Sequence, residues 1–356
     1  MNSAEILNLR LYNQLLTSHQ LKAPNEIVSW MGAMQSQALD MAKWAIGTRL
    51  ENQTIRDVEE ALNTGQIIRT HTLRPTWHFV SADDVHWMFD LSNPRLKPIY
   101  HCYAKMRQID ESLIYNAIPV LEKILIGGKH LTKQEIGSAL QTQDITLDDD
   151  HLKSAITYAE MEGILVNGRL KGKKQTFTLL EEWAPRKQTI CKEEALEHLA
   201  RKYFTSHSPA TIHDFAWWSG LSITECRQAL EMIKVDFICE TINERDFWMK
   251  SDIKVPPVDS NSALLLPAFD EFVISYKDRS EMIEDIHYGK VMTKNGLFSP
   301  TIMLNGKIIG SWKKVAHKST PRIELSFFEK TSQRKQDLFK PEIKRLEKFY
   351  SKEKTK

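Results

Sequence analysis

Two glutamines separated by one residue, Gln35 and Gln37, have the side chains in this sequence best suited by type and spacing to act on a water molecule. A neutral amide is a weak base, but it donates through NH₂ and accepts through its oxygen, so two amides can hold and polarise one water. In a regular helix such a pair points about 200° apart, whereas in extended backbone it shares a face. The two amides can therefore converge only where the backbone leaves the helical conformation.

Apolar residues recur at helical spacing on both sides of this pair. They are Ile27, Trp30, Met31 and Met34 before it, and Met41, Trp44, Ala45 and Ile46 after it. Two helices that bury these residues would place the glutamines at the joint between them. A plainer interpretation stays open, because glutamine is usually exposed and the pair could be solvated polar residues at that joint.

Several common catalytic motifs do not occur in the sequence. It has no GxxxxGK[ST], GxGxxG, HExxH or GxSxG, which argues against nucleotide hydrolysis, dinucleotide redox chemistry, zinc proteolysis and α/β-hydrolase chemistry. The cysteines, Cys102, Cys191, Cys226 and Cys239, form no CxxC pair and have no histidine at metal-ligand spacing. We therefore expect free thiols, no metal and no cofactor.

Length and composition indicate an ordinary globular protein of two to three domains. Of its 356 residues, 42% are hydrophobic and 26% are charged. No apolar run approaches the roughly 18 residues of a membrane span, and the N-terminus lacks the pattern of a signal peptide. We expect a soluble, cytoplasmic monomer with no membrane partner.

Positive charge is unevenly distributed, although the net charge is only +2. From residue 305 to residue 356 there are 15 Lys and Arg against 6 Asp and Glu. A second cluster, Arg169, Lys171, Lys173 and Lys174, lies within six residues. Such clusters can follow a phosphate backbone, and solvated surfaces produce them equally well.

Periodicity predicts a helix–helix–hairpin pattern that occurs three times. The first occurrence has helices at Leu7–Leu16, from Pro24, at Ala38–Leu50 and after Thr54, with strands at Ile67–Leu73 and Trp77–Val80. The second has helices at Ser112–Ile126, after Leu131 and after Asp150, with strands at Ile164–Val166 and Thr176–Leu180 around an Asn167-Gly168 turn. The third has helices at Cys191–Phe204, after Thr211 and after a capping box at Ser222–Glu225, with strands at Phe237–Thr241 and Asp246–Lys250. Helices followed by a hairpin are typical of a winged helix.

The C-terminal part changes to a period of two beyond a linker at Lys254–Asn261. Strands are expected at Ala263–Leu266, Glu271–Tyr276, Lys290–Met292, Ser299–Leu304 and Lys307–Trp312, followed by a helix at Pro341–Phe349. We predict an α+β fold of three tandem winged-helix domains and a small C-terminal β-barrel. The domains are residues 1–105, 106–187 and 188–255, the barrel 262–328, and a basic helix and tail 329–356.

A DNA partner follows from winged helices with basic hairpins, because a wing can lie along the backbone while a helix enters a groove. The residues alone leave three classes open: an enzyme acting on DNA, a non-enzymatic winged-helix DNA-binding protein such as a transcriptional regulator, and a scaffold that binds protein. Histidines 71 and 78 lie on one predicted hairpin, where histidine is most often structural.

Nearly the whole chain resembles the AlkZ-like (AlkZ/YcaQ) winged-helix DNA glycosylase family. The resemblance rests on Met34-Gln35-Ser36-Gln37, Leu73-Arg74-Pro75-Thr76-Trp77-His78, Ser208–Thr211, Asp214–Gly220, LLLPAFDEFVISYKDR at Leu264–Arg279 and FSPTIMLNGKIIGSW at Phe298–Trp312. The last two segments are long and specific.

The resemblance implies a monofunctional DNA glycosylase that excises N-alkylated purines from double-stranded DNA, as family members do, some of which also unhook interstrand crosslinks. In the family a Gln-x-Gln or Gln-x-Asp motif positions the water, and Gln35 and Gln37 match the Gln-x-Gln form, which makes them the expected catalytic residues. Its middle residue is usually apolar, and Ser36 departs from this. Expected DNA-binding residues are Arg74, His78, Arg169, Lys171, Lys173 and Lys174.

Overall fold

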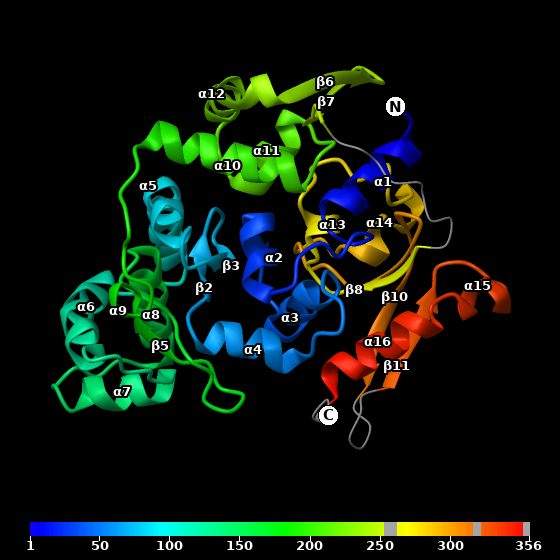
Figure 1. Cartoon of the computed structure of the whole chain (residues 1–356). Coiled ribbons are helices and arrows are strands. Elements are labelled where there is room, and N and C mark those ends of the chain that lie inside the picture. The colour runs from blue at the N-terminus through cyan, green and yellow to red at the C-terminus, as the bar shows by residue number, and fades with distance from the viewer. Residues whose placement is uncertain (253–261, 316–321, 352–356) are drawn as a thin grey trace. The chain divides into compact units, whose positions relative to one another are not determined.

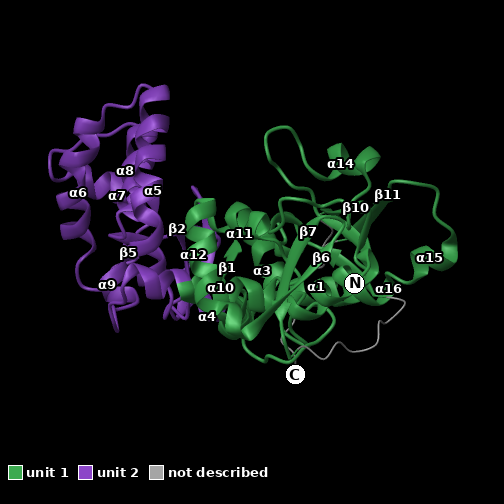
Figure 2. Cartoon of the chain, turned by 90° about the horizontal axis from the view of Figure 1, so that it is seen from above, with its two compact units in different colours: residues 1–58, 197–356 green, residues 59–196 purple. Residues whose placement is uncertain are grey.

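The computed structural model describes residues 1–252, 262–315 and 322–351. The chain divides into two units, residues 1–58 with 197–356 and residues 59–196 (Figure 2). The linker expected at Lys254–Asn261 lies outside the described residues. Within them, no helix is both long and apolar enough to cross a membrane.

The first unit combines short helices with strands (Figure 1). Its helices are α1 (Ser3–Asn13), α2 (Pro24–Met31), α3 (Leu39–Gly47), α11 (Ile212–Ser219), α12 (Ile223–Ile233), α13 (Glu271–Ile274), α14 (Asp285–Val291), α15 (Gln333–Asp337) and α16 (Lys340–Tyr350), with a 3₁₀ turn at Lys234–Asp236. Its strands are β1 (Ala33–Gln35), β6 (Phe237–Ile242), β7 (Arg245–Lys250), β8 (Ala263–Leu266), β9 (Thr301–Leu304), β10 (Lys307–Val315) and β11 (Arg322–Phe327). Two further helices, α4 (Ile55–Asn63) and α10 (Lys192–Ser206), continue from one unit into the other.

The second unit is mainly helical, with two hairpins. It contains α5 (Val85–Met106), α6 (Glu111–Leu125), α7 (Lys133–Gln141), α8 (Asp149–Met161), α9 (Leu180–Trp183), β2 (Ile67–Thr72), β3 (Thr76–Ser81), β4 (Leu165–Asn167) and β5 (Phe177–Leu179). Helices α6, α7 and α8 pack around one apolar core that includes Ile114, Leu121, Ile136 and Ile156. A buried polar chain joins β2 to α8 and β4: Arg69 donates to Asn167 (2.8 Å), and Asn167 and His71 both contact Glu160 (3.1 Å each).

Capping residues fix where several helices begin. The capping box predicted at Ser222–Glu225 is confirmed, with the hydroxyl of Ser222 accepting from the Glu225 N–H and the Glu225 carboxylate accepting from the Ser222 N–H. Thr132 and Glu135 do the same at the start of α7. These reciprocal bonds satisfy backbone N–H groups that have no partner inside the helix. The order helix–helix–hairpin occurs as α3–α4–β2–β3, α7–α8–β4–β5 and α11–α12–β6–β7.

Helix α5 is missing from the sequence-based prediction. It contains Pro94 and Pro98, and an internal proline removes a backbone hydrogen bond and costs about 3 kcal/mol. The helix forms nevertheless because it buries a long apolar face, including Trp87, Met88 and Leu96. Tertiary burial here outweighs the local preference.

The turn predicted at Asn167-Gly168 is wrong. Asn167 pairs with Phe177 in the β4–β5 ladder, and the Gly168 N–H donates to the Thr176 carbonyl at 2.9 Å. The chain reverses further out, between Lys171 and Lys174, which form an isolated bridge around Gly172. Gly172 has φ +64°, a conformation that glycine adopts without steric cost. The hairpin loop is therefore longer than predicted, with the basic cluster spread along it.

In the C-terminal part the strands β8–β11 form one antiparallel sheet in the order β11-β10-β9-β8. The strands predicted at Ala263–Leu266 and Lys307–Trp312 and the helix at Pro341–Phe349 are confirmed. The described residues form no closed barrel. Strands predicted at Glu271–Tyr276 and Lys290–Met292 are wrong, since α13 and the end of α14 occupy them. All four residues of α13 are buried, so the segment lacks the alternation that distinguishes a strand, and the Asp270 side chain caps it.

Candidate active site

The segment between α2 and α3 positions the two glutamines. Helix α2 ends at Gly32, whose φ of +77° turns the chain into β1. Gln35 is the last residue of β1 and is 8% exposed, whereas Gln37 lies in the following bend and is exposed. The backbone leaves the helical conformation between the two helices, as the sequence predicts, and it does so through a short strand.

The backbone at Gln35 is anchored by a buried carboxylate. The Gln35 N–H donates to Oε1 of Glu271 at 2.6 Å. The other carboxylate oxygen accepts from the Trp218 indole N–H at 3.1 Å and from the Ser275 hydroxyl. His207 Nε2 lies 3.8 Å from the same oxygen, and both side chains of this pair are almost completely buried. Glu271 therefore anchors the backbone at the end of β1.

Glu271 carries a negative charge in this position. Burial by itself raises the pKa of a carboxyl group, but the neighbouring His207, the Ser275 hydroxyl and the Gln35 N–H lower the pKa of Glu271 to about 2. At neutral pH the group is consequently a carboxylate. The carboxylate therefore lies within hydrogen-bond distance of the Gln35 backbone N–H.

A second buried acid holds the helix that carries Glu271. Asp270 accepts from Arg49 Nη1 at 2.9 Å and from Nη2 at 3.0 Å, and neither side chain is exposed. The Asp270 carboxylate also accepts from the Phe272 N–H at 2.9 Å, which starts α13. The preceding residue, Phe269, has φ +60°, a strained value for an aromatic residue. Trp217 donates to the Ile274 carbonyl at the other end of α13 (2.9 Å).

Asp40, the carboxylate nearest to the motif in sequence, is engaged elsewhere. Its carboxylate pairs with Lys314 Nζ at 2.7 Å, and its backbone carbonyl accepts from the Tyr350 hydroxyl at 2.8 Å. These bonds join the first turn of α3 to β10 and α16. The contacts describe a structural role for Asp40.

The DNA-binding candidates all belong to the second unit, whereas Gln35 and Gln37 belong to the first. Arg74 lies in the turn between β2 and β3 and is partly exposed. His78 lies in β3, is fully buried, and its Nδ1 contacts the Thr76 carbonyl at 2.9 Å. The side chain of His78 is therefore placed as a structural histidine would be, and its contact with DNA stays a prediction.

The basic cluster lines the β4–β5 loop, and its four members differ in what they contact. Lys171 pairs with Glu135 of the α7 capping box, a bond that is the main cause of lowering the pKa of Glu135 to about 2. The Arg169 guanidinium lies 5.3 Å from the centre of the Trp183 ring. Lys173 and Lys174 are exposed, and no ion pair holds either ammonium group within residues 1–252, 262–315 and 322–351.

We expect replacement of Arg169, Lys171, Lys173 and Lys174 by alanine to weaken binding to all duplexes alike. Removing a phosphate contact should reduce the slope of log K against log salt by about 1. Most of the effect should come from Lys173 and Lys174, with Lys171→Ala as the matched single control, because Glu135 already holds Lys171. Fluorescence anisotropy at several salt concentrations measures both quantities. Unchanged affinity and slope in the quadruple variant would show that the loop is only solvated surface.

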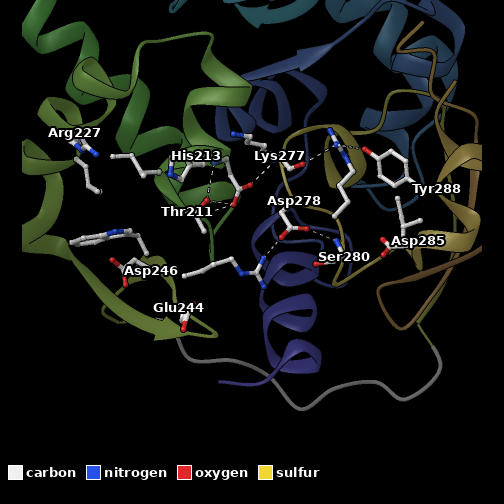
Figure 3. Close-up of a pocket in the computed structure, with 17 residues that line it drawn as sticks. Thr211, His213, Arg227, Glu244, Asp246, Lys277, Asp278, Ser280, Asp285 and Tyr288 are labelled. Carbon is white, nitrogen blue, oxygen red and sulfur yellow. Dashed lines mark hydrogen bonds and ion pairs between the residues drawn. The ribbon is translucent and has the colours of Figure 1, made fainter. Parts of the chain in front are cut away.

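A cavity of about 790 Å³ lies elsewhere in the first unit (Figure 3). Its lining carries charges of both signs: Arg245 pairs with Asp278 at 2.6 Å, and Arg279 Nη1 donates to the Tyr288 hydroxyl at 3.0 Å. Neither glutamine is among the residues that line it. This mixture of charges does not specify a class of ligand.

One grouping of potential metal ligands is invisible in the sequence spacing. Ligand atoms of Glu284, His287 and Glu329 lie within 4.8 Å of one another. Both carboxylates are exposed. The positively charged Nζ of Lys290 lies 3.5 Å from His287 Nδ1, where it would repel a metal cation. This grouping does not by itself define a metal site.

Sequence reasoning missed Glu271 and its partners Trp218, Ser275 and His207 as site residues. Most of them belong to motifs that carried the family resemblance, but nothing in their spacing connects them to Gln35, which is 236 positions from Glu271. The acidic residue at the start of an otherwise apolar run, EFVI, is the only local signal. A charged residue in such a run needs buried partners.

Comparison with known proteins identifies the family of this chain. The family model described as DNA glycosylase AlkZ-like matches residues 28–349, which include both Gln35 and Glu271. The interstrand DNA cross-link repair glycosylase of Streptomyces sahachiroi is 21% identical over 334 residues, 87% of each chain. The solved structure of the Streptomyces sahachiroi DNA glycosylase AlkZ has the same fold, with a TM-score of 0.79 and 17% identity over 98% of this chain and 96% of that chain. The chain therefore belongs to the AlkZ-like family of DNA glycosylases.

Proposed function

We propose that this glycosylase excises N-alkylated purines from double-stranded DNA by attack of a water molecule at C1′, and that Gln35 and Gln37 hold the water. The observation that supports this most directly is the anchored, non-helical backbone of the Gln-x-Gln segment, where Glu271 fixes the N–H of Gln35. A rigid backbone is what a pair of amides needs to act as preorganised dipoles. Membership of a glycosylase family favours this function over a regulator or a scaffold.

The proposed chemistry suits amides because the substrate supplies much of the driving force. N-alkylation makes the purine cationic, so the C1′–N bond breaks with both electrons going to the base, which leaves as a neutral molecule. Positive charge develops on the sugar, the water oxygen bonds to C1′, and the water gives up a proton to solvent. Two amide oxygens can orient that water and favour the developing charge. Undamaged purines leave poorly without a strong acid and should remain in place.

We further propose that the three helix–helix–hairpin groups are winged-helix domains with the boundaries predicted from the sequence, and that they bind duplex DNA together with the C-terminal sheet. The relative from Streptomyces sahachiroi is named for interstrand cross-link repair. A crosslinked purine is itself an N-alkylated purine, so the same step would release one end of such a crosslink. The enzyme would work as a monomer in the cytoplasm.

Duplex containing 7-methylguanine tests the proposal. We expect release of the methylated base and an abasic site, no excision of normal purines, and no covalent adduct after borohydride, because amides cannot form a Schiff base. Activity should survive a chelator, since no proposed step uses a metal. Borohydride trapping or loss of activity with chelator would contradict the water mechanism. Binding of the duplex without any base release would support the regulator instead.

A further inference from the structure

We propose that Glu271 is a positioning residue for the glycosylase reaction: its buried carboxylate accepts from the Gln35 N–H and so fixes the backbone of the water-holding pair. This inference rests on the proposed function of Gln35 and Gln37. It concerns a residue outside the Gln-x-Gln motif, brought to that motif only by the fold.

The contacts of Glu271 connect it to the motif directly. Its Oε1 accepts from the Gln35 N–H at 2.6 Å, a short distance typical of a charge-assisted hydrogen bond. Gln35 is the last residue of β1, so this bond sets where its side chain starts. In enzymes, displacing a reacting group by about 1 Å can cost on the order of 10²-fold in rate.

Retention of a full charge at this position needs an explanation, because burying a carboxylate is costly unless it is well paired. Glu271 is 1% exposed, and it accepts from a backbone N–H, the Trp218 indole and the Ser275 hydroxyl, while His207 Nε2 lies 3.8 Å from Oε2. The guanidinium of Arg49 is already bound bidentately by the neighbouring Asp270. A glutamine in its place would have a single acceptor oxygen, so its NH₂ would face either the Gln35 N–H or the Trp218 and Ser275 donors. Only a carboxylate accepts on both sides at once, and this is what holds the Gln35 N–H against α13.

The test compares variants of the full chain in single-turnover excision of 7-methylguanine. Glu271→Gln keeps one acceptor oxygen but replaces the other by an NH₂ group, so it cannot accept on both sides, and we expect its rate to fall about tenfold to a hundredfold. Glu271→Asp keeps the charge and should recover part of the rate. Duplex affinity should change little, and the melting temperature reports how much stability the unsatisfied buried donors cost. Glu342→Gln, which removes the carboxyl group of another buried glutamate in the first unit, is the matched control and should excise normally.

Dependence on Gln35 separates positioning from a general structural effect. Because Glu271 acts through Gln35, adding Glu271→Gln to Gln35→Ala should slow excision by less than about threefold further. Additive losses, or a Glu271→Gln variant that excises at the wild-type rate, would overturn the inference. If Glu271→Gln does not fold, Ser275→Ala removes one donor to the carboxylate with little change in volume. The Ser275→Ala variant should slow excision about three- to tenfold, and an unchanged rate would also overturn the inference.

Failure of the proposed function looks different in the same experiment. If Gln35→Ala excises at the wild-type rate, the Gln pair does not hold the water, whatever Glu271 does. If Gln35→Ala is slow and Glu271→Gln is normal, the proposed function stands and only the role of Glu271 is refuted. The two failures are therefore distinguishable.

Discussion

Alanine at Gln35 or at Gln37 should slow single-turnover excision of an alkylated purine by roughly 10²- to 10³-fold, about 3–4 kcal/mol of transition-state free energy. This is the typical cost of removing one preorganised polar group at a developing charge. Both side chains are proposed to hold the same water, so the double variant should lose far less than the product of the two single effects. Release of 7-methylguanine under excess enzyme measures the chemical step.

Binding and folding should separate this effect from simple damage to the fold. Gln37 is exposed, so Gln37→Ala should leave both the melting temperature and the affinity for undamaged duplex nearly unchanged. Gln37→Asp keeps an oxygen at this position and imitates the acidic form of the motif in the resembled family. It should retain activity, with a changed preference among lesions.

Asp40 supplies the internal control, because a carboxylate so close to the motif could act as the base. Its ion pair with Lys314 points to a structural role, so Asp40→Asn should keep most of the excision rate. The assignment of the site is wrong if both glutamine variants excise normally while Asp40→Asn is inactive. If none of the three residues affects excision of any alkylated base, the water is held elsewhere.

Removing the acid that neutralises Arg49 should have the largest effect on stability. We expect Asp270→Ala to lower the free energy of unfolding by about 3–5 kcal/mol, because it leaves a fully buried guanidinium without a counter-charge. Arg49 would keep its bonds to Gln14 and to the Ala45 carbonyl, which satisfy hydrogens but supply no negative charge. A typical domain has only about 5–15 kcal/mol in total, so this loss is large.

Urea denaturation measures this prediction without screening the charges by salt. Replacing both partners, Arg49→Met with Asp270→Leu, should give a protein more stable than Asp270→Ala, since no charge then remains buried. Asp337→Ala breaks an exposed pair with Lys340 and should barely move the urea midpoint. A midpoint for Asp270→Ala that matches this control would show that the buried pair contributes nothing to stability.

Local features of the sequence determined much of the secondary structure. A capping box is complete within four residues, so Ser222 and Glu225 predict the start of α12 from local sequence alone. The helical spacing around Gln35 and Gln37 likewise predicts two helices with a break between them, and α2, β1 and α3 confirm it. Family membership was also accessible, because the motifs that carry it are continuous segments.

Where local preference and tertiary burial conflict, the sequence alone led to errors. Two internal prolines argue against a helix at α5, but the helix forms because it buries an apolar face. The EFVI segment is expected as a strand because a short apolar run does not distinguish a strand from a buried helix, and α13 buries all four of its residues. The Asn167-Gly168 pair suggested a tight turn, but pairing with Phe177 and Thr176 continues past it to Gly172.

Only the tertiary structure decided what surrounds the glutamines. Glu271 reaches Gln35 across 236 positions, and Asp270 reaches Arg49 across 221. Neither pairing can be predicted from nearby residues, because the hydrogen-bond donors to a buried carboxylate come from segments that are distant in sequence and meet only in the folded chain. The residue types of the motif were therefore set by the sequence, whereas the buried carboxylate that anchors its backbone comes from the packing of α13 against β1.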